Sequence, residues 1–493
     1  MRGIAMRIFL RGRRTGPSLT MMLSMALGLG LAASFTACTT PSPPPRVERA
    51  AAPPLRSPST AAVARKVNVV DHRGETLDQG EREQMLRKVA AQGNATLVQR
   101  QMAAMSGFGE LDLYSGNDAR LLIDGPQTFA AMFAAIRRAR QQILLESYII
   151  EDAEVSRQLA ELLAQKRAQG VAVHLIYDAV GSFGTQESYF DGLRQAGVAI
   201  CAFNPVNPLK RPGYFDITNR DHRKILVVDN EIGFTGGINI SAVYSSGSSL
   251  GRKRKASDEE IARDGWRDTQ LQLRGPAVTA LGELVRETWQ QQGCEGRIAA
   301  LPQPAKGTPA GQQLMRIVPA APSDASNRIY AMLLTAIGAA QRSVYLTMAY
   351  FAPGNEMIDA LCAAAHRGVD VQLVLPSRSD FTPVLHAGRS HYERLLEAGV
   401  KIHELQDAVL HAKTAVIDGV VSTVGSSNLD WRSFTSNTEV NAVVIGDDFG
   451  QAMTQMFRRD LAASQTISGE AWRERPAWQR FKESLARAFE RWW

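Results

Sequence analysis

The chain has 493 residues, of which 45% are hydrophobic and 21% are charged, and its formal net charge is +7. This composition excludes a wholly disordered chain, a collagen-like chain and a small disulfide-rich protein, while the length allows two large domains or about three of ordinary size. The four cysteines form no CxxC pair or Cys/His cluster, so no structural zinc site is expected. The positive charge at first suggests an anionic partner, either nucleic acid or a membrane surface.

Residues 1–37 are predicted to be a signal peptide. Residues 1–20 contain five arginines and no acid, and the apolar stretch 21–33 is too short to span a membrane but suits a signal core. The next segment, Ser34–Cys38, resembles the lipobox of bacterial lipoproteins, which implies cleavage before Cys38 and lipidation of that residue; the alternative is an ordinary secretory signal. Removing the five arginines would lower the net charge from +7 to +2, so the high charge mostly reflects targeting.

Residues 38–64 are predicted to be the lipid anchor and a tether rich in proline, alanine and serine, because they lack the apolar content of a core. Residues 65–107 are predicted to be a helical N-terminal extension that serves as a lid, a partner site or a spacer. By resemblance to enterobacterial lipoproteins, Thr39 rather than aspartate after the anchored cysteine favours the outer membrane. We therefore expect a cell-envelope protein, lipid-anchored and facing the periplasm.

An internal repeat organises the rest of the chain. Residues 193–200 resemble 395–402, and residues 171–178 resemble 369–376. In each half, short β-rich runs alternate with helical patterns, which predicts an α/β fold with helices on the faces of a sheet. The expected boundaries are 108–300 for the first domain, 301–312 for a linker and 313–470 for the second domain.

One short motif occurs at the same place in both halves. Its six residues, the candidate catalytic set, are His222, Lys224 and Asp229 in the first copy and His411, Lys413 and Asp418 in the second. Each aspartate is followed after ten residues by an asparagine, Asn239 or Asn428. A single match would be a weak signal, but two copies in register with an internal repeat are a strong one.

The spacing within the motif predicts what each residue type does. Histidine and lysine two positions apart on a strand point to the same face, and a lysine ammonium suits phosphate oxygens. Asp229 and Asp418 begin predicted turns, so we expect them to hold local structure rather than to react. Asp268 and Glu439, one acid per repeat, are expected to bond the far nitrogen of each histidine and fix its tautomer.

Two facing histidines suit phosphodiester exchange. One neutral imidazole attacks phosphorus while the other, protonated, gives a proton to the leaving alkoxide. The resulting phosphohistidine is resolved by an alcohol or by water. The two lysines and two asparagines would offset the charge that grows on the phosphoryl oxygens. This chemistry needs no cofactor and no metal, and the sequence contains no ligand cluster that indicates one.

At these residues the chain resembles the phospholipase D superfamily, and most closely the bacterial cardiolipin synthases that carry two such motifs. The resemblance covers about residues 108–470 and includes 234–240 and 425–441, although Ala242 stands where many synthases have an acid. It implies two pseudo-twofold-related α/β domains with one active site at their interface. It also implies His222 as the nucleophile and His411 as the acid/base, or the reverse order.

The reaction that this resemblance implies is transfer of a phosphatidyl group from one phospholipid to phosphatidylglycerol, which gives cardiolipin. The expected partners are phosphatidylglycerol, a second phospholipid such as phosphatidylethanolamine, and a membrane surface, with a monomeric catalytic unit. No nucleic acid is expected. The alternatives are a phospholipase D that hydrolyses lipids to phosphatidic acid, a nuclease, which the fused repeats argue against, and a non-catalytic envelope protein.

Three further features remain open at the level of sequence. Cys201, Cys294 and Cys362 are expected to be buried thiols without a catalytic role, and with Cys38 lipidated at most one disulfide can form. The basic run 252–255 is either a solvated loop or a docking site for anionic head groups. Residues 471–493 are predicted to be an amphipathic C-terminal helix, whose apolar face either packs on the core or lies at a membrane interface. That face consists of Trp478, Phe481, Leu485, Phe489 and Trp492.

Overall fold

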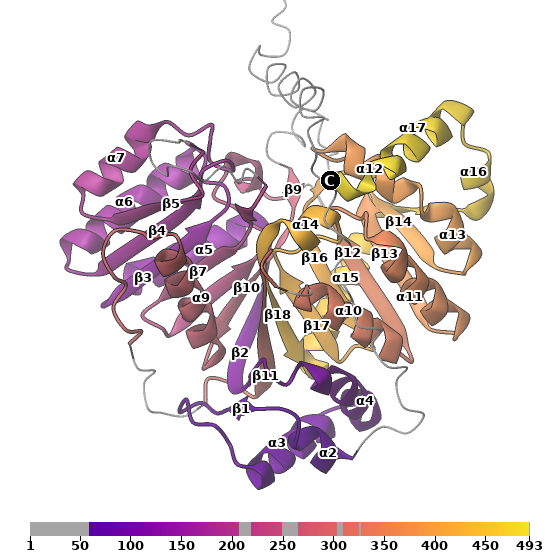
Figure 1. Ribbon diagram of the computed structural model, residues 1–493, viewed down its shortest axis with the longest axis horizontal. Helices are drawn as coiled ribbons and strands as arrows, with labels where there is room; N and C mark the ends of the chain where they lie inside the picture. The colour runs from indigo at the N-terminus through magenta and orange to yellow at the C-terminus, as the bar shows by residue number, and fades with distance from the viewer. Residues whose placement is uncertain (1–58, 207–217, 249–264, 303–308, 325–326, 493) are drawn as a thin grey trace, which may run out of the picture. The chain divides into compact units, whose positions relative to one another are not determined.

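The computed structural model describes residues 59–206, 218–248, 265–302, 309–324 and 327–492, all within one compact unit that spans residues 45–493 (Figure 1). The predicted signal peptide, the predicted lipidation site Cys38 and the basic run 252–255 lie outside the described residues. Within these ranges, none of the helices combines the length and apolar character needed to span a membrane.

The first half of the repeat builds a mixed sheet. Its elements are β2 (Leu113–Ile123), α5 (Asp124–Arg138), β3 (Gln142–Ser147), α6 (Glu154–Ala168), β4 (Ala172–Asp178), α7 (Glu187–Gln195), β5 (Ala199–Phe203), β6 (Arg220–Asp221), β7 (Lys224–Val228), β8 (Ile232–Gly236), β9 (Trp266–Arg267), β10 (Thr269–Arg274) and α9 (Ala277–Gln291). Pairing gives the strand order β2-β10-β8-β7-β3-β4-β5, in which β3–β4 and β4–β5 are parallel and the other pairs antiparallel.

The second half repeats this arrangement. Its elements are β11 (Gln313–Ala320), α10 (Arg328–Ala339), β12 (Ser343–Met348), α11 (Gly354–His366), β13 (Asp370–Pro376), α12 (Thr382–Arg389), α13 (Tyr392–Glu397), β14 (Lys401–Leu405), β15 (Val409–Leu410), β16 (Lys413–Ile417), β17 (Val421–Gly425), α14 (Trp431–Thr435), β18 (Asn437–Ile445), α15 (Asp447–Ala462) and β19 (Ser464–Ile467). The order β11-β18-β17-β16-β12-β13-β14 matches the first sheet strand for strand, and β19 adds an edge.

The two sheets meet where β2 pairs antiparallel with β11. Helices cover both faces: α5, α6 and α7 pack on one face of the first sheet, and α9 shares a core with α15 that draws on strands of both halves. Strands β7 and β16 are therefore buried along their whole length, which explains their continuous apolar runs. The predicted fold of two related α/β domains is confirmed.

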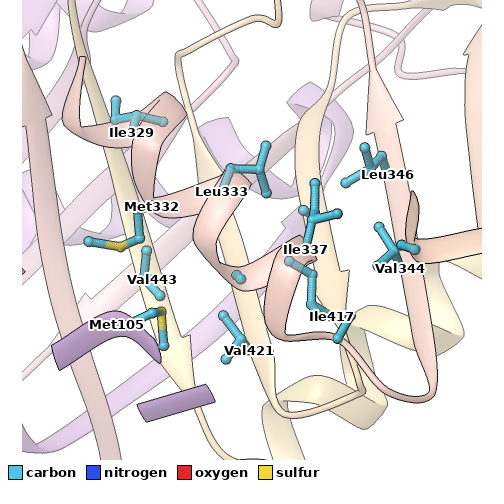
Figure 2. Close-up of a cluster of buried hydrophobic side chains, with 14 of the residues drawn as sticks. Met105, Ile329, Met332, Leu333, Ile337, Val344, Leu346, Ile417, Val421 and Val443 are labelled. Atoms are coloured by element: carbon cyan, nitrogen blue, oxygen red, sulfur yellow. The ribbon is translucent and has the colours of Figure 1, made fainter. Parts of the chain in front are cut away.

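The N-terminal extension contains α2 (Thr60–Ala64), β1 (Val69–Val70), α3 (Gln79–Ala91) and α4 (Ala95–Met105). Although it directly precedes the first half, it shares a core with the second. Figure 2 shows Met105 beside Met332 of α10 and Val443 of β18, and all three belong to one buried cluster. Gln101 also donates a hydrogen bond to the carboxylate of Asp418 at 3.0 Å. The extension thus has a structural role in closing the core of the second half.

The cysteines differ in part from the prediction. Cys201, in β5, and Cys294, just after α9, form a disulfide, so the expectation of buried free thiols is wrong for these two residues. They are 93 positions apart in sequence, but the fold brings the end of α9 back beside β5 and their Cα atoms to 5.6 Å. Cys362 is a buried free thiol, as expected.

The C-terminal segment consists of α16 (Gly469–Arg473), α17 (Ala477–Ala488) and a final 3-10 turn, Glu490–Trp492. The apolar face predicted for it does not pack on the core: its five large side chains are all exposed. Instead, the helix is held by its other side, where Glu483, Ala486 and Glu490 are buried. Of the two alternatives that the sequence left open, core packing is therefore wrong.

Candidate active site

Two pairs of short strands, each pair formed between the two halves, position the motif histidines. His222 lies between β6 and β7, and β6 pairs in parallel with the start of β18 in the second half. His411 lies between β15 and β16, and β15 pairs in parallel with β9 in the first half. The backbone N–H of His222 donates to Thr438 at 2.9 Å, and that of His411 donates to Arg267 at 2.8 Å. Each histidine is thus tied to the opposite half.

This strand pairing between the halves determines which acid contacts which histidine. Both carboxylate oxygens of Glu439 lie 3.0 Å from Nδ1 of His222, and Oδ2 of Asp268 lies 2.7 Å from Nδ1 of His411. A carboxylate can only accept, so these contacts favour the tautomer in which Nδ1 carries the proton and Nε2 keeps its lone pair. At His411 the Lys413 ammonium, a donor, competes with Asp268 for the same Nδ1. In both cases the acid comes from the half that does not contain the histidine.

Burial and the acid–base partners change the pKa of these groups. Burial opposes ionisation of Glu439, but the contact with His222 and the charge of Lys224 outweigh it, and the pKa of Glu439 falls to about 2. Burial lowers the pKa of His222 to about 4, against the opposing effect of Glu439, and burial together with Lys413 lowers the pKa of His411. Both imidazoles are therefore neutral at pH 7, the form in which Nε2 can attack phosphorus.

The two lysines of the motif are buried beside the histidines. Lys224 Nζ donates to the carbonyl of His222 at 2.7 Å and lies 5.1 Å from the ring centre of Tyr148. Lys413 Nζ donates to the carbonyl of His411 and lies 2.8 Å from its Nδ1. Burial lowers the pKa of Lys224 to about 7 and that of Lys413 to about 8. A bound phosphate would restore their charge by supplying an anionic partner.

The two motif aspartates lie at the other ends of the strands, in the turns between β7 and β8 and between β16 and β17. Both have positive φ, 53° for Asp229 and 55° for Asp418, a conformation that aspartate tolerates better than most residues. The carboxylate of Asp229 accepts from the backbone N–H groups of residues 140–142, and that of Asp418 from those of residues 341–343. These contacts tie each turn to the start of the neighbouring strand, β3 or β12.

Asn239 and Asn428 follow β8 and β17 and line the same cavity as the histidines. The side-chain oxygen of Asn239 accepts from the backbone N–H of Ile149 at 3.2 Å, which leaves its NH₂ group near Tyr244 Oη at 3.4 Å. The backbone N–H of Asn428 donates to Ser433 Oγ at 3.3 Å. Both amides thus return to the side of the sheet that carries the motif histidines.

The histidines open into a cavity of about 620 Å³ that both halves line. Aromatic side chains that the sequence reasoning missed form much of its wall: Tyr148, Tyr244, Trp266 and Tyr350. Tyr148 meets His222 with ring centres 5.0 Å apart, and Trp266 meets His411 at 5.2 Å. One signal for two of them was available, because Tyr148 and Tyr350 each follow closely on the equivalent strands β3 and β12.

Polar residues of the wall were also missed. The Glu151 carboxylate accepts from Ser241 Oγ at 2.5 Å and from the backbone N–H of Ala242 at 3.1 Å, so an acid lies beside the position where Ala242 departs from the synthase pattern. Asp430 caps α14 through Ser433, and burial raises its pKa to about 6. Arg432 supplies an exposed guanidinium at the cavity.

Comparison with known proteins identifies the fold. Among solved structures, a phosphatidylserine synthase from Haemophilus influenzae covers 80% of this chain and 97% of its own, with a TM-score of 0.56 and 12% identity, which shows a common fold. The family described as "Cardiolipin synthase, PLD-like domain" matches residues 132–246 and 333–461, one segment in each half. The fold is therefore the phospholipase D-like α/β fold, present twice.

Similar proteins of known name identify the family within this fold. Cardiolipin synthase A of Pseudomonas fluorescens is 35% identical over 401 residues, which is 81% of this chain and 80% of the relative. Cardiolipin synthase 2 of Bacillus cereus is 34% identical over 382 residues, 77% of this chain and 71% of the relative. The chain belongs to the phospholipase D-like cardiolipin synthase family.

Proposed function

We propose that the protein is a phosphatidyltransferase that makes cardiolipin from phosphatidylglycerol and a second phospholipid. The observation that carries this proposal is one cavity faced by two histidine–lysine pairs, each histidine oriented by an acid of the opposite half, in a chain of the cardiolipin synthase family. Phospholipids are the substrates of such an enzyme. Phosphatidylglycerol as acceptor, with phosphatidylglycerol or phosphatidylethanolamine as donor, is the specific form that we propose.

In the first step, Nε2 of neutral His222 attacks the phosphorus of the donor lipid. A P–N bond forms, the P–O bond to the head group breaks, and His411 transfers a proton from its Nε2 to the departing alkoxide. His411 must be protonated for this, and the anionic phosphodiester entering beside it raises its pKa from the depressed value of the free site. Lys224 and Lys413 offset the negative charge on the phosphoryl oxygens.

In the second step, His411, now neutral, takes the proton from a glycerol hydroxyl of phosphatidylglycerol. The alkoxide attacks phosphorus, the P–N bond breaks, and His222 is restored. With phosphatidylglycerol as donor, the products are cardiolipin and glycerol. Glu439 and Asp268 keep both Nδ1 protons in place throughout and stabilise whichever imidazole is positively charged. Both motifs and both acids belong to one chain, which supports a monomeric catalytic unit.

The test is a lipid assay. Purified protein is mixed with phosphatidylglycerol, alone or with phosphatidylethanolamine, and the lipids are followed by mass spectrometry. We expect cardiolipin with the wild type and none with His222→Ala or His411→Ala, while Asn94→Ala, a helix-cap substitution far from the cavity, keeps the activity. Phosphatidic acid as the sole product would identify a hydrolase instead. Cardiolipin formed by His222→Ala would disprove the role of this residue.

For the location, we propose a lipoprotein of the cell envelope that faces the periplasm, with the outer membrane favoured by Thr39. Besides the leader sequence, the disulfide between Cys201 and Cys294 supports an exported protein, because disulfides persist in oxidising compartments such as the periplasm. Labelling with a fatty acid followed by membrane fractionation tests this. Wild type should be labelled and Cys38→Ser should not; equal labelling of both would refute the anchor.

A further inference from the structure

The C-terminal segment carries most of the exposed large hydrophobic side chains found in the described part of the chain. The large hydrophobic side chains exposed there are Trp478 (56%), Phe481 (68%), Leu485 (52%), Phe489 (47%) and Trp492 (62%) in the segment, with Phe183 (81%), Phe381 (37%) and Val206 (46%) elsewhere. Five of these eight therefore lie on one helix and the turn after it. Contiguous exposed patches of this kind mark interaction surfaces, whereas single exposed residues do not.

Positive and negative charges of residues 477–492 lie on opposite sides of this segment. Within residues 477–492 the basic residues all face solvent: Arg480, Lys482, Arg487 and Arg491. The two acids of residues 477–492, Glu483 and Glu490, are buried and paired within the protein, Glu483 with Arg475 at 2.9 Å and Glu490 with His391 at 3.1 Å. The outward face of residues 477–492 is thus apolar and cationic, without an exposed carboxylate.

This surface adjoins the wall of the catalytic cavity. Helix α17 lies beside α12 (Figure 1), and Ala486 packs in one cluster with Val384 and Ala387 of α12. Val384 itself lines the cavity, and so does Phe381 just before α12. The inward side of α17 thus packs on the helix that lines the cavity, and its outward face lies on the far side of that contact.

The loops at the cavity add a symmetric pair of aromatic side chains. Phe183 follows the end of β4 by five residues, and Phe381 follows the end of the equivalent strand β13 by the same number. Gly181, Gly184 and Thr185, which surround Phe183, line the cavity from the first half, as Phe381 does from the second. Each half of the repeat thus places one exposed phenylalanine at the cavity.

We propose that residues 477–492, together with Phe183 and Phe381, form a docking surface for the face of an anionic phospholipid bilayer. The helix would lie in the interface plane with Trp478 and Trp492 near its two ends, as tryptophan prefers the level of the head groups. Lys482 extends over the ring of Trp478, at 4.2 Å from its centre, where its ammonium stays at head-group level. The cationic face without exposed acids favours an anionic lipid surface over a second copy of this basic surface.

The consequence is an orientation of the enzyme on the membrane. A tether at the N-terminus leaves the direction of the cavity free, whereas docking through α17, Phe183 and Phe381 turns the cavity toward the lipid layer. The docking itself is independent of the chemistry at the histidines. Only its effect on activity rests on the proposed function.

The first experiment measures docking directly in the full chain. An environment-sensitive fluorophore is attached at Phe481→Cys, or at Lys88→Cys on α3, which lies at the opposite end of the described structure (Figure 1). Both proteins carry Cys38→Ser, and Cys362 is buried. With phosphatidylglycerol vesicles we expect a blue shift at position 481 that position 88 lacks and that neutral phosphatidylcholine vesicles reduce. Equal responses at both positions, or a lipid-independent shift that grows with protein concentration, would overturn the proposal.

The second experiment separates docking from catalysis. Phe481→Ser/Leu485→Ser and Arg480→Glu/Arg487→Glu remove the apolar and the cationic parts, and Arg137→Glu/Arg138→Glu on α5 is the matched control. We expect cardiolipin formation on vesicles to fall about tenfold in both test variants, with activity on dispersed short-chain phosphatidylglycerol within about twofold of wild type. His222→Ala should keep the fluorescence shift while losing activity. A loss on both kinds of substrate, or on neither, would contradict the proposal.

Discussion

Burial is the largest cause of the pKa shifts of the motif histidines and lysines. A histidine in water titrates near 6.5, but burial lowers the pKa of His222 to about 4, and it also lowers the pKa of Lys224 to about 7 and of Lys413 to about 8, from the usual 10.5. In the proposed mechanism, neutral His222 is therefore available over a wide pH range, whereas the positive charges of Lys224 and Lys413 are lost from about neutrality upward.

The first prediction is the pH profile of kcat/KM. Protonation disables His222 only near pH 4, so activity should persist on the acid side well below 6.5. On the basic side, Lys224 and Lys413 lose their charge from about pH 7 and 8, so kcat/KM should fall there. Because Glu439 raises the pKa of both His222 and Lys224, Glu439→Gln should move both limbs to lower pH. Unchanged limbs in this variant would contradict the assignment, with Glu161→Gln, an exposed carboxylate on α6, as the control.

The second prediction is that the buried charge of Lys224, which the proposed reaction needs, lowers the free energy of unfolding. Its folded pKa, about 7, lies below the usual 10.5, so the charged form is disfavoured in the fold. This cost appears as pH falls from 10.5 toward 7 and is complete below 7. Lys224→Met should therefore raise Tm at pH 6–7, with a gain that vanishes near pH 10.5, and should abolish activity. Thermal unfolding across pH checks this; a lower Tm at pH 6 would refute it, and Lys88→Met on the surface should change little.

At the scale of elements, the pairing of short strands between the halves explains how the two histidines are oriented. Strand β9 places Asp268 beside His411, and β18 places Glu439 beside His222, so neither half can orient its own histidine. A buried ion pair holds β9 in its pairing with β15 of the second half. Arg267 of β9 binds Asp460 of α15 with two hydrogen bonds, at 2.7 and 2.9 Å, and the Arg267 carbonyl accepts from the backbone of His411.

The third prediction concerns this pair. Asp460→Ala leaves a buried guanidinium without its main anionic partner, which should lower the free energy of unfolding by about 3–5 kcal/mol. The double variant Arg267→Met/Asp460→Leu should lose less, because it leaves no buried charge uncompensated. Urea unfolding of both variants gives the comparison. A double variant less stable than Asp460→Ala would contradict this explanation.

For the whole molecule, the extension, the disulfide and the C-terminal segment add contacts around the two repeats. Residues 60–105 close the core of the second half. Helix α17 packs beside α12 through Ala486, and Glu490 in the turn after α17 contacts His391 just past α12. The disulfide between Cys201 and Cys294 closes a loop of 93 residues that contains His222 and Lys224. Constraining the unfolded state over such a loop stabilises the folded chain.

The fourth prediction follows from this loop. Cys201→Ser/Cys294→Ser should lower the free energy of unfolding by about 2–5 kcal/mol. The activity at low temperature should remain, because neither sulfur lines the cavity. Thermal unfolding with and without reductant is the measurement: reductant should lower Tm of the wild type and of Cys362→Ala, but not of the double serine variant. A Tm of the wild type that is insensitive to complete reduction would refute the stabilising role.

The sequence by itself determined the duplicated α/β fold and the six motif residues, because these depend on patterns that are local in the chain and occur twice. The turn aspartates could be interpreted in the same way, since Asp229 and Asp418 hold their own turns. The aromatic wall of the cavity could not be inferred, because Tyr244 and Trp266 lie outside any periodic pattern that would place them near His411.

Only the tertiary structure decided which partners meet across the chain. Nothing local in the sequence assigns Asp268 to His411 or pairs Cys201 with Cys294, because both depend on segments that are more than ninety residues apart. The same holds for α17, whose periodicity fits a core helix and a surface helix equally well. The exposure of Trp478 and Phe481 distinguishes the two, since α12 and the buried Glu483 already occupy the other side of the helix.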